Sequence, residues 1–126
     1  MPFVHITSLP FDQPFDVPEV VAGISNDFAE ATGVGLEHVT ATWQVLLPGY
    51  YAVAGITAQC QPEASHPVLV EILAPDFQTP EQIETALLAV AVSIAGRTGI
   101  PRQNIFINYR QAHSGMVFDA GELVRW

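Results

Sequence analysis

The sequence contains no lysine, and every basic residue is an arginine: Arg97, Arg102, Arg110 and Arg125. A Schiff-base or pyridoxal-binding lysine and the lysine of a phosphate-binding P-loop are therefore excluded. The 4 basic residues stand against 13 Asp and Glu, which gives a formal net charge of −9. Because an anionic surface repels phosphate groups, neither nucleic acid nor an anionic membrane is expected as a partner.

Cysteines and long apolar runs are also scarce. Cys60 is the single cysteine, so an intramolecular disulfide cannot form. His5, His66 and His113 lack the spacing of a metal site, and no cofactor-binding motif is present. No stretch is long enough to span a membrane, and the amino-terminal segment lacks the basic and apolar regions of a secretory signal. We expect a cytoplasmic protein that acts without a cofactor or metal.

An internal repeat organises the sequence. A shift of 66 residues aligns Val4–Ile6 with Val70–Ile72 and Thr32–Val34 with Thr98–Ile100. Each copy has the pattern of strand, helix and strand, which predicts two right-handed β-α-β units. We expect one domain, residues 1–126, with pseudo-repeats 1–60 and 67–126.

Local signals place the helices. Asp16 and Thr79 each stand three residues before Glu or Gln, with a proline in the first turn, as at a helix start. Gly33 and Gly99 stand where a left-handed C-terminal cap is expected. The predicted fold class is α+β, with a four-stranded mixed sheet and both helices on one face.

Three further segments complete this prediction. Tyr50–Thr57 is expected to add a short edge strand to the sheet, and Gln61–His66 to form a polar linker. The segments 116–118 and 122–124 flank Asp119-Ala120-Gly121, which predicts a small C-terminal hairpin.

Alternation divides the last strand of each repeat into two faces. One set of residues is expected beneath the helices: Val39, Ala41, Trp43, Ile105, Ile107 and Tyr109. The intervening set faces away from them: Thr40, Thr42, Gln44, Phe106, Asn108 and Arg110. The second face combines polar residues with Phe3 and Phe106, so a lone chain would expose an apolar surface and oligomerisation is predicted.

Pro2 is the first candidate for chemistry. Removal of Met1 would leave its ring nitrogen as a secondary amine at the chain terminus. In an apolar site, desolvation favours the neutral amine, which then serves as a base near neutral pH. The alternative is that Pro2 only begins a strand, where a missing N–H has no cost.

These features together resemble the tautomerase superfamily: Met1-Pro2, the β-α-β repeat, Thr32-Gly33 and Thr98-Gly99, and Asn104–Tyr109 before a glycine-containing hairpin. The stretch Ile107–Val117 is similar to the macrophage migration inhibitory factor branch. Thr32–Glu37 and Phe118–Gly121 are similar to the malonate semialdehyde decarboxylase branch. The resemblance implies a homotrimer with a pocket at each subunit boundary and the freed Pro2 amine at its base.

The resemblance also implies roles for individual residues. Pro2 would be the general base or acid, and Glu37 stands where the decarboxylase branch has an aspartate that works with the proline. The residues implied to bind substrate are His38, Phe106, Asn108 from a neighbouring subunit, and Val117, with Arg110 as a further candidate. Asn108 and Phe106 lie on the face predicted to point away from the helices, where such a pocket is expected.

The sequence departs from these branches in its basic residues. Val34 stands where the inhibitory factor branch has a lysine, and Ala74-Pro75-Asp76 where the decarboxylase and dehalogenase branches have arginines. Arg110 either folds into the pocket or is a solvated residue at a strand end. A dianionic substrate is therefore disfavoured, because its charge would meet an acidic protein with no cationic clamp.

Three functions follow as hypotheses. The first is a tautomerase-like enzyme in which Pro2 moves a proton on a small keto-enol compound or unsaturated oxo acid. The second keeps the same site with a cationic Pro2, which would give decarboxylation or hydration with Glu37. The third is a trimeric binding or scaffold module without catalysis.

Overall fold

The computed structural model describes residues 1–126. The elements that build the main layers are β1 (Phe3–Ser8), α1 (Val17–Thr32), β2 (Thr40–Val45), β5 (Val68–Pro75), α2 (Pro80–Thr98) and β6 (Ile105–Ala112). Two short hairpins are formed by β3 (Ala52–Val53) with β4 (Ile56–Thr57) and by β7 (Val117–Asp119) with β8 (Glu122–Val124). Single 3₁₀ turns, Leu36–His38 and Arg102–Asn104, precede β2 and β6.

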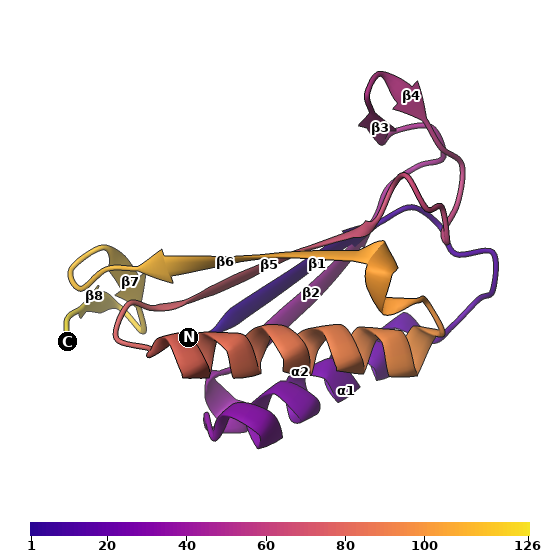
Figure 1. Cartoon of the computed structure of the whole chain (residues 1–126). Coiled ribbons are helices and arrows are strands. Elements are labelled where there is room, and N and C mark those ends of the chain that lie inside the picture. The colour runs from indigo at the N-terminus through magenta and orange to yellow at the C-terminus, as the bar shows by residue number, and fades with distance from the viewer.

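The main sheet has four strands in the order β2-β1-β5-β6. The outer pairs, β1 with β2 and β5 with β6, are parallel, and the central pair, β1 with β5, is antiparallel. Both helices cover the same face of this sheet (Figure 1). The predicted α+β class, mixed sheet and one-sided helix layer are confirmed.

The helix ends form as the sequence predicts. The Asp16 side chain accepts a hydrogen bond from the Glu19 backbone N–H, and Thr79 with Gln82 forms a complete capping box at the start of α2. Gly33 and Gly99 end the two helices in the left-handed conformation, with φ of 77° and 78°. These glycines are required there because a Cβ is strained at positive φ.

The hydrophobic core lies between the helices and one face of the sheet. Val4 and Ile6 of β1 and Val70 and Ile72 of β5 are almost fully buried there. The predicted inner residues of β2 and β6 pack against this core, whereas Phe106 on the other face is 56% exposed. The assignment of the two faces is therefore confirmed.

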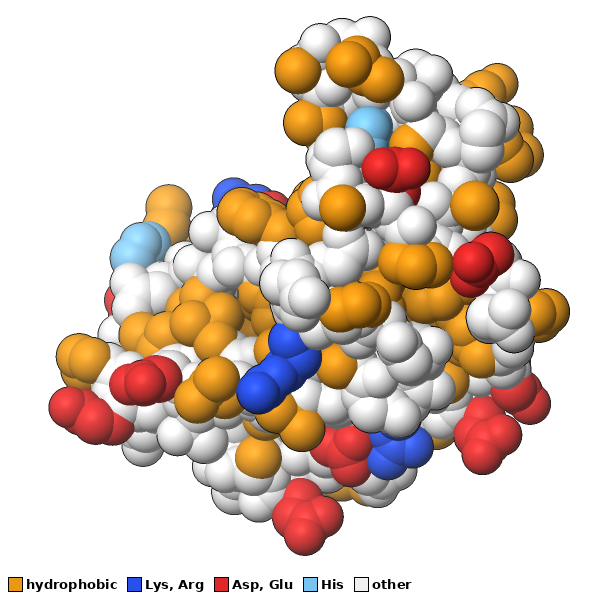
Figure 2. Space-filling view, turned by 45° about the vertical axis from the view of Figure 1, so that its right-hand side comes forward, with side chains coloured by type: hydrophobic (Ala, Val, Ile, Leu, Met, Phe, Trp, Pro, Cys, Tyr) orange, Lys and Arg blue, Asp and Glu red, His pale blue; other side chains and the backbone are white.

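The expected edge strand at Tyr50–Thr57 is not part of the sheet. The segment instead forms the β3-β4 hairpin, which stands away from the main layers (Figure 1). Its turn contains Ala54 and Gly55, both with positive φ, so the chain reverses within two residues and pairs with itself. Apolar side chains gather on this projection in the space-filling view (Figure 2), and Tyr50 and Ile56 are 71% and 67% exposed.

The segment Gln61–His66, expected as a polar linker, is buried at both ends. The Gln61 side chain accepts a hydrogen bond from the Leu9 N–H and donates to the His66 carbonyl oxygen at 2.9 Å. The His66 ring lies 2.7 Å from the Ile56 carbonyl oxygen and meets the Tyr51 ring edge to face. The segment forms no helix or extended strand, as expected of a linker, but composition did not reveal that its two end residues are buried with their polar groups satisfied in the interior.

The predicted C-terminal hairpin is confirmed as β7 and β8. Its turn, Ala120-Gly121, has positive φ at both residues, which matches the twist of a tight hairpin. The chain end is held to the β5-α2 loop by the Trp126 indole N–H, which donates to Asp76 at 2.8 Å. Neither helix is long and apolar enough to cross a bilayer.

Candidate functional site

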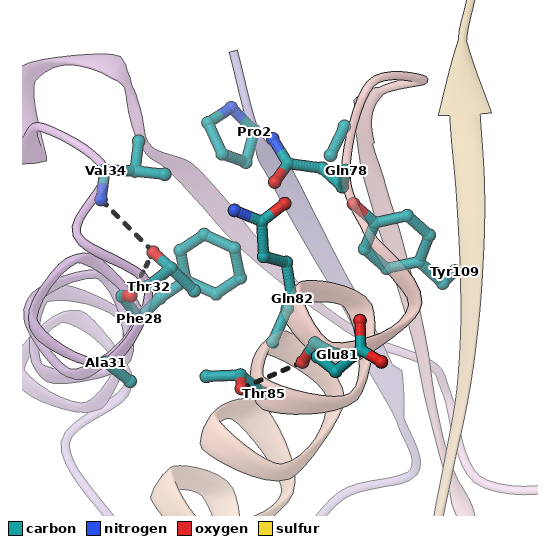
Figure 3. Close-up of a pocket in the computed structure, with 12 residues that line it drawn as sticks. Pro2, Phe28, Ala31, Thr32, Val34, Gln78, Glu81, Gln82, Thr85 and Tyr109 are labelled. Carbon is teal, nitrogen blue, oxygen red and sulfur yellow. Dashed lines mark hydrogen bonds between the residues drawn. The ribbon is translucent and has the colours of Figure 1, made fainter.

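A cavity of about 230 Å³ lies at the end of the molecule where β1 begins (Figure 3). Since β1 and β5 are antiparallel, the start of β1 meets the end of β5, and the first turn of α2 follows directly. The end of α1 reaches the same place because the next strand, β2, runs parallel to β1. The lining residues are Pro2, Phe28, Ala31, Thr32, Val34, Ala74, Gln78, Glu81, Gln82, Thr85, Ala86 and Tyr109.

Pro2 lies against the helix layer, in the wall of this cavity. Its carbonyl oxygen accepts a hydrogen bond from the Thr40 N–H at 3.0 Å, which extends the pairing of β1 with β2 by one residue. Strand alternation places Pro2 on the same face as Val4 and Ile6, and its ring is buried. The register therefore fixes the direction in which the ring points.

The end of α1 forms a second wall. The Thr32 hydroxyl donates to the Phe28 carbonyl oxygen at 2.7 Å, and the Val34 N–H donates back to the Thr32 oxygen at 3.4 Å. With Gly33 as the left-handed cap, this turn directs the Val34 side chain toward the cavity (Figure 3). Val34, the residue that replaces a lysine of the inhibitory factor branch, thus contributes an apolar surface.

The first turn of α2 contributes the polar wall. Gln82 Oε1 accepts a hydrogen bond from the Thr79 N–H at 2.8 Å as part of the capping box. With its oxygen held by the helix cap, the Gln82 amide turns its nitrogen toward the side of the cavity where Pro2 and Val34 lie (Figure 3). Gln78, from the loop before the helix, lies next to this amide and close to Pro2.

Tyr109 closes the cavity from β6. Its ring packs against the core, as the sequence predicts, but its hydroxyl points toward the amides of Gln78 and Gln82 (Figure 3). The hydroxyl makes no hydrogen bond within the chain, and burial raises the pKa of Tyr109 above its usual value of 10.0. The phenol is therefore protonated at neutral pH and free to donate to a bound molecule.

The site carries no positive charge. Glu81 is the one ionisable lining residue besides Tyr109, and none of the twelve residues is basic. Nearby, Asp76 accepts a hydrogen bond from His113 at 2.8 Å, and this contact lowers the pKa of the Asp76 carboxyl group. No group of three or more His, Cys, Asp or Glu is arranged to hold a metal ion.

Of the residues selected from the sequence, Pro2 alone lines this cavity. Glu37 and His38 lie on the 3₁₀ turn before β2, with Glu37 Oε1 3.6 Å from His38 Nε2 and both side chains largely exposed. Val117 begins the C-terminal hairpin. None of these three residues lines the Pro2 cavity in the single chain.

Phe106, Asn108 and Arg110 lie on the open face of the sheet, opposite the helices. Arg110 Nη1 is 3.7 Å from Glu71 Oε2 on the neighbouring strand. The expectation that the Pro2 pocket lies on this open face is not met within a single chain, because alternation along β1 places Pro2 on the helix face.

The polar residues of the cavity were missed from the sequence. In the sequence, Thr79-Pro80-Glu81-Gln82 serves only as a helix start signal. Strand alternation assigns Tyr109 only to the core. The one available clue was position: both the end of β6 and the start of α2 must lie beside the start of β1 once the central strands are antiparallel.

Several solved structures share this fold. A native fused 4-OT matches with a TM-score of 0.81 and 14% identity, over 96% of this chain and 94% of that one. A protein solved after inactivation by 2-oxo-3-pentynoate matches with a TM-score of 0.80 and 17% identity, over 97% and 94%. A macrophage migration inhibitory factor-like protein from Entamoeba histolytica gives 0.72 and 12% identity, over 97% of each chain. This chain has the tautomerase fold.

The tautomerase fold is thus shared over nearly the full length of the chain, and the resemblance drawn from the sequence is confirmed at that level. No protein-family model and no curated protein sequence matches the chain. With identities of 17% or less, the shared tautomerase fold places the elements but leaves the chemistry to be argued from the residues themselves.

Proposed function

We propose that the protein is a tautomerase-like enzyme in which Pro2, freed by removal of Met1, moves a proton on a small keto-enol compound. The observation that carries this proposal is the buried Pro2 ring in the wall of a small cavity, facing neutral hydrogen-bond donors. In the chain as printed, Met1 acylates the Pro2 nitrogen, and an amide nitrogen has no basic lone pair. Removal of Met1 is therefore the first requirement of the mechanism.

The surroundings favour a neutral amine. The apolar groups of Phe28, Val34 and Ala74 line the same cavity, and desolvation disfavours a charged ammonium. The chain offers no basic side chain within the cavity, and Glu81 acts in the opposite direction by favouring the cation. The balance between desolvation and the attraction of Glu81 sets the fraction of Pro2 amine that is neutral at neutral pH. Titration of the Pro2 nitrogen measures this fraction.

Pro2 moves the proton from carbon to oxygen in two steps. The Pro2 lone pair takes the proton from the carbon next to a carbonyl group. The C–H electron pair becomes a C=C bond, and the C=O π electrons move to oxygen. That oxygen accepts a hydrogen bond from a neutral donor of the cavity wall, the Tyr109 hydroxyl or the Gln82 amide, as its charge develops. The prolinium then returns its proton to the oxygen, which yields the enol, and the reverse sequence converts enol to ketone.

We further propose that the active form is a homotrimer. Two features support this: Phe3 and Phe106 are 37% and 56% exposed on the open sheet face, and one similar structure is a symmetric trimer of a fused 4-OT. In such an assembly Asn108 of a neighbouring copy would reach a pocket. Light scattering after gel filtration should give three times the 13.6 kDa chain mass.

The catalytic role of Pro2 is tested by mass and by substitution. Intact-mass measurement of untagged protein should show loss of Met1, and Pro2→Ala should lower kcat/KM for phenylpyruvate enol-keto exchange by about 100-fold or more. Pro101→Ala, at an exposed proline outside the cavity, is the matched control and should keep full activity. Retention of Met1 with no measurable exchange would leave the chain as a non-catalytic binding or scaffold module, whereas an unchanged rate in Pro2→Ala would contradict the catalytic role of Pro2.

The cationic alternative is separated by titration. Labelling the prolyl nitrogen with ¹⁵N and following its shift with pH gives its pKa directly. A pKa near or below 7 supports the base, whereas an amine protonated well above neutral pH supports decarboxylation or hydration with Glu37. In a single chain Glu37 is exposed and outside the cavity, so the base mechanism is the one we propose.

A further inference from the structure

We propose that the Pro2 cavity selects uncharged carbonyl compounds and discriminates against carboxylates. This inference rests on the proposed proton transfer by Pro2 and deepens it by naming the substrate class. The polar groups that line the cavity are amides, hydroxyls and the exposed carboxylate of Glu81, with no cation among them.

The polar groups suit a neutral carbonyl oxygen. The Tyr109 hydroxyl and the Gln82 Nε2 are donors whose charge is zero, and the capping box holds the Gln82 amide in its orientation. Such donors bind a carbonyl or an enolate oxygen, but they do not offset a full negative charge as a bidentate arginine does.

The start of α2 also disfavours a substrate carboxylate. A helix amino terminus favours a negative charge, and Glu81 in the first turn already supplies one. A substrate carboxylate entering the cavity would therefore be repelled by the Glu81 carboxylate. A helix start without an acidic residue would instead attract it. The formal net charge of −9 adds a long-range repulsion of the same sign.

A neighbouring copy has few cations to supply. All copies carry the same four arginines and no lysine. Arg97 is engaged with Asp27 at 2.9 Å, and Arg110 lies 3.7 Å from Glu71. Half of the basic residues are thus already beside carboxylates of their own chain.

The test compares a carboxylate with its methyl ester, which lacks the charge and carries one additional methyl group. Phenylpyruvate and its methyl ester share one skeleton and both exchange between keto and enol forms, which absorbance follows. We expect kcat/KM to be about tenfold higher for the ester, the size of a single screened charge repulsion at close range. Raising the salt concentration should narrow this ratio.

Matched variants separate a local charge from the total charge. Glu81→Gln should reduce the ester-to-acid ratio severalfold. Glu84→Gln removes the same charge from an exposed position of α2 outside the cavity and should leave the ratio unchanged. Equal effects of both variants would show that only net charge matters and would overturn the assignment to Glu81.

A binding measurement makes the inference independent of turnover. Methyl benzoate and benzoate have no hydrogen on a carbon next to the carbonyl group and form a non-reacting pair, and the side-chain amide signals of Gln82 report their binding by NMR. Tighter binding of methyl benzoate is expected. Preference for benzoate or phenylpyruvate, or no binding of either ring compound, overturns the inference. A preference for the acid with a rate that still depends on Pro2 contradicts only the substrate class, whereas a rate independent of Pro2 contradicts the proposed function itself.

Discussion

Removal of the Tyr109 hydroxyl should change the catalytic rate without changing the stability of the fold. Because this hydroxyl makes no hydrogen bond within the chain and its ring packs against the core, Tyr109→Phe removes no intramolecular partner. The free energy of unfolding should therefore change by less than about 0.5 kcal/mol. The loss of one donor to a developing oxyanion should lower kcat by about 10- to 100-fold, which is about 1.4 to 2.7 kcal/mol of transition-state stabilisation.

Tyr51 provides the matched control. Its hydroxyl donates to the Pro67 carbonyl oxygen at 3.1 Å, beneath the β3-β4 hairpin and away from the cavity. Tyr51→Phe should cost about 1 kcal/mol of stability and leave the rate unchanged. Urea unfolding followed by circular dichroism and initial rates of phenylpyruvate exchange measure the two quantities on the same samples.

The pH profile adds an independent readout. Burial raises the pKa of Tyr109 above 10.0, so the protonated donor persists through neutral pH and is lost only when the pH exceeds that raised value. The contribution of the Tyr109 hydroxyl to the rate should therefore persist up to at least pH 10. A Tyr109→Phe variant with wild-type kcat, or one that unfolds more easily than Tyr51→Phe, would refute the placement of the hydroxyl in the site.

Three further changes probe the scaffold. Gln61→Ala removes a fully buried amide that holds backbone groups of two loops, and should cost about 2 to 3 kcal/mol in urea unfolding; a cost below that of an ordinary surface change would contradict this network. Hydrogen bonding from Arg97 lowers the pKa of Asp27 from 3.8, so this contribution is present above pH 4 and is lost as the pH falls through the lowered value. With both side chains about one third exposed, Asp27→Asn should cost about 0.5 to 1 kcal/mol at pH 7 and nothing near pH 2. Thr79→Ala removes the hydroxyl that accepts from the Gln82 backbone N–H and should cost about 1 kcal/mol; KM should stay unchanged, because the backbone N–H of residue 79 still holds the Gln82 amide oxygen, and a raised KM would contradict this orientation.

Most of the secondary structure could be predicted because its signals are local. Asp16 and Thr79 start the helices and Gly33 and Gly99 end them through contacts within a single turn. Alternation in the last strand of each repeat likewise assigned Trp43 and Tyr109 to the core face, since successive strand residues must point to opposite sides. Where a segment could either pair with itself or join a sheet edge, as at Tyr50–Thr57, local pattern did not decide.

The candidate site depends on contacts between distant parts of the chain. Pro2 could be selected from the sequence because its chemistry follows from its position after Met1. Val34, Gln78 and Tyr109 meet it only through the antiparallel register of β1 with β5 and the packing of both helices on that sheet. The positions of these residues along the sequence do not determine the distances between them in the fold. The sequence by itself therefore determined the elements, their faces and one reactive residue, whereas the tertiary structure decided which side chains surround that residue, because only packing brings four separate segments to one end of the fold.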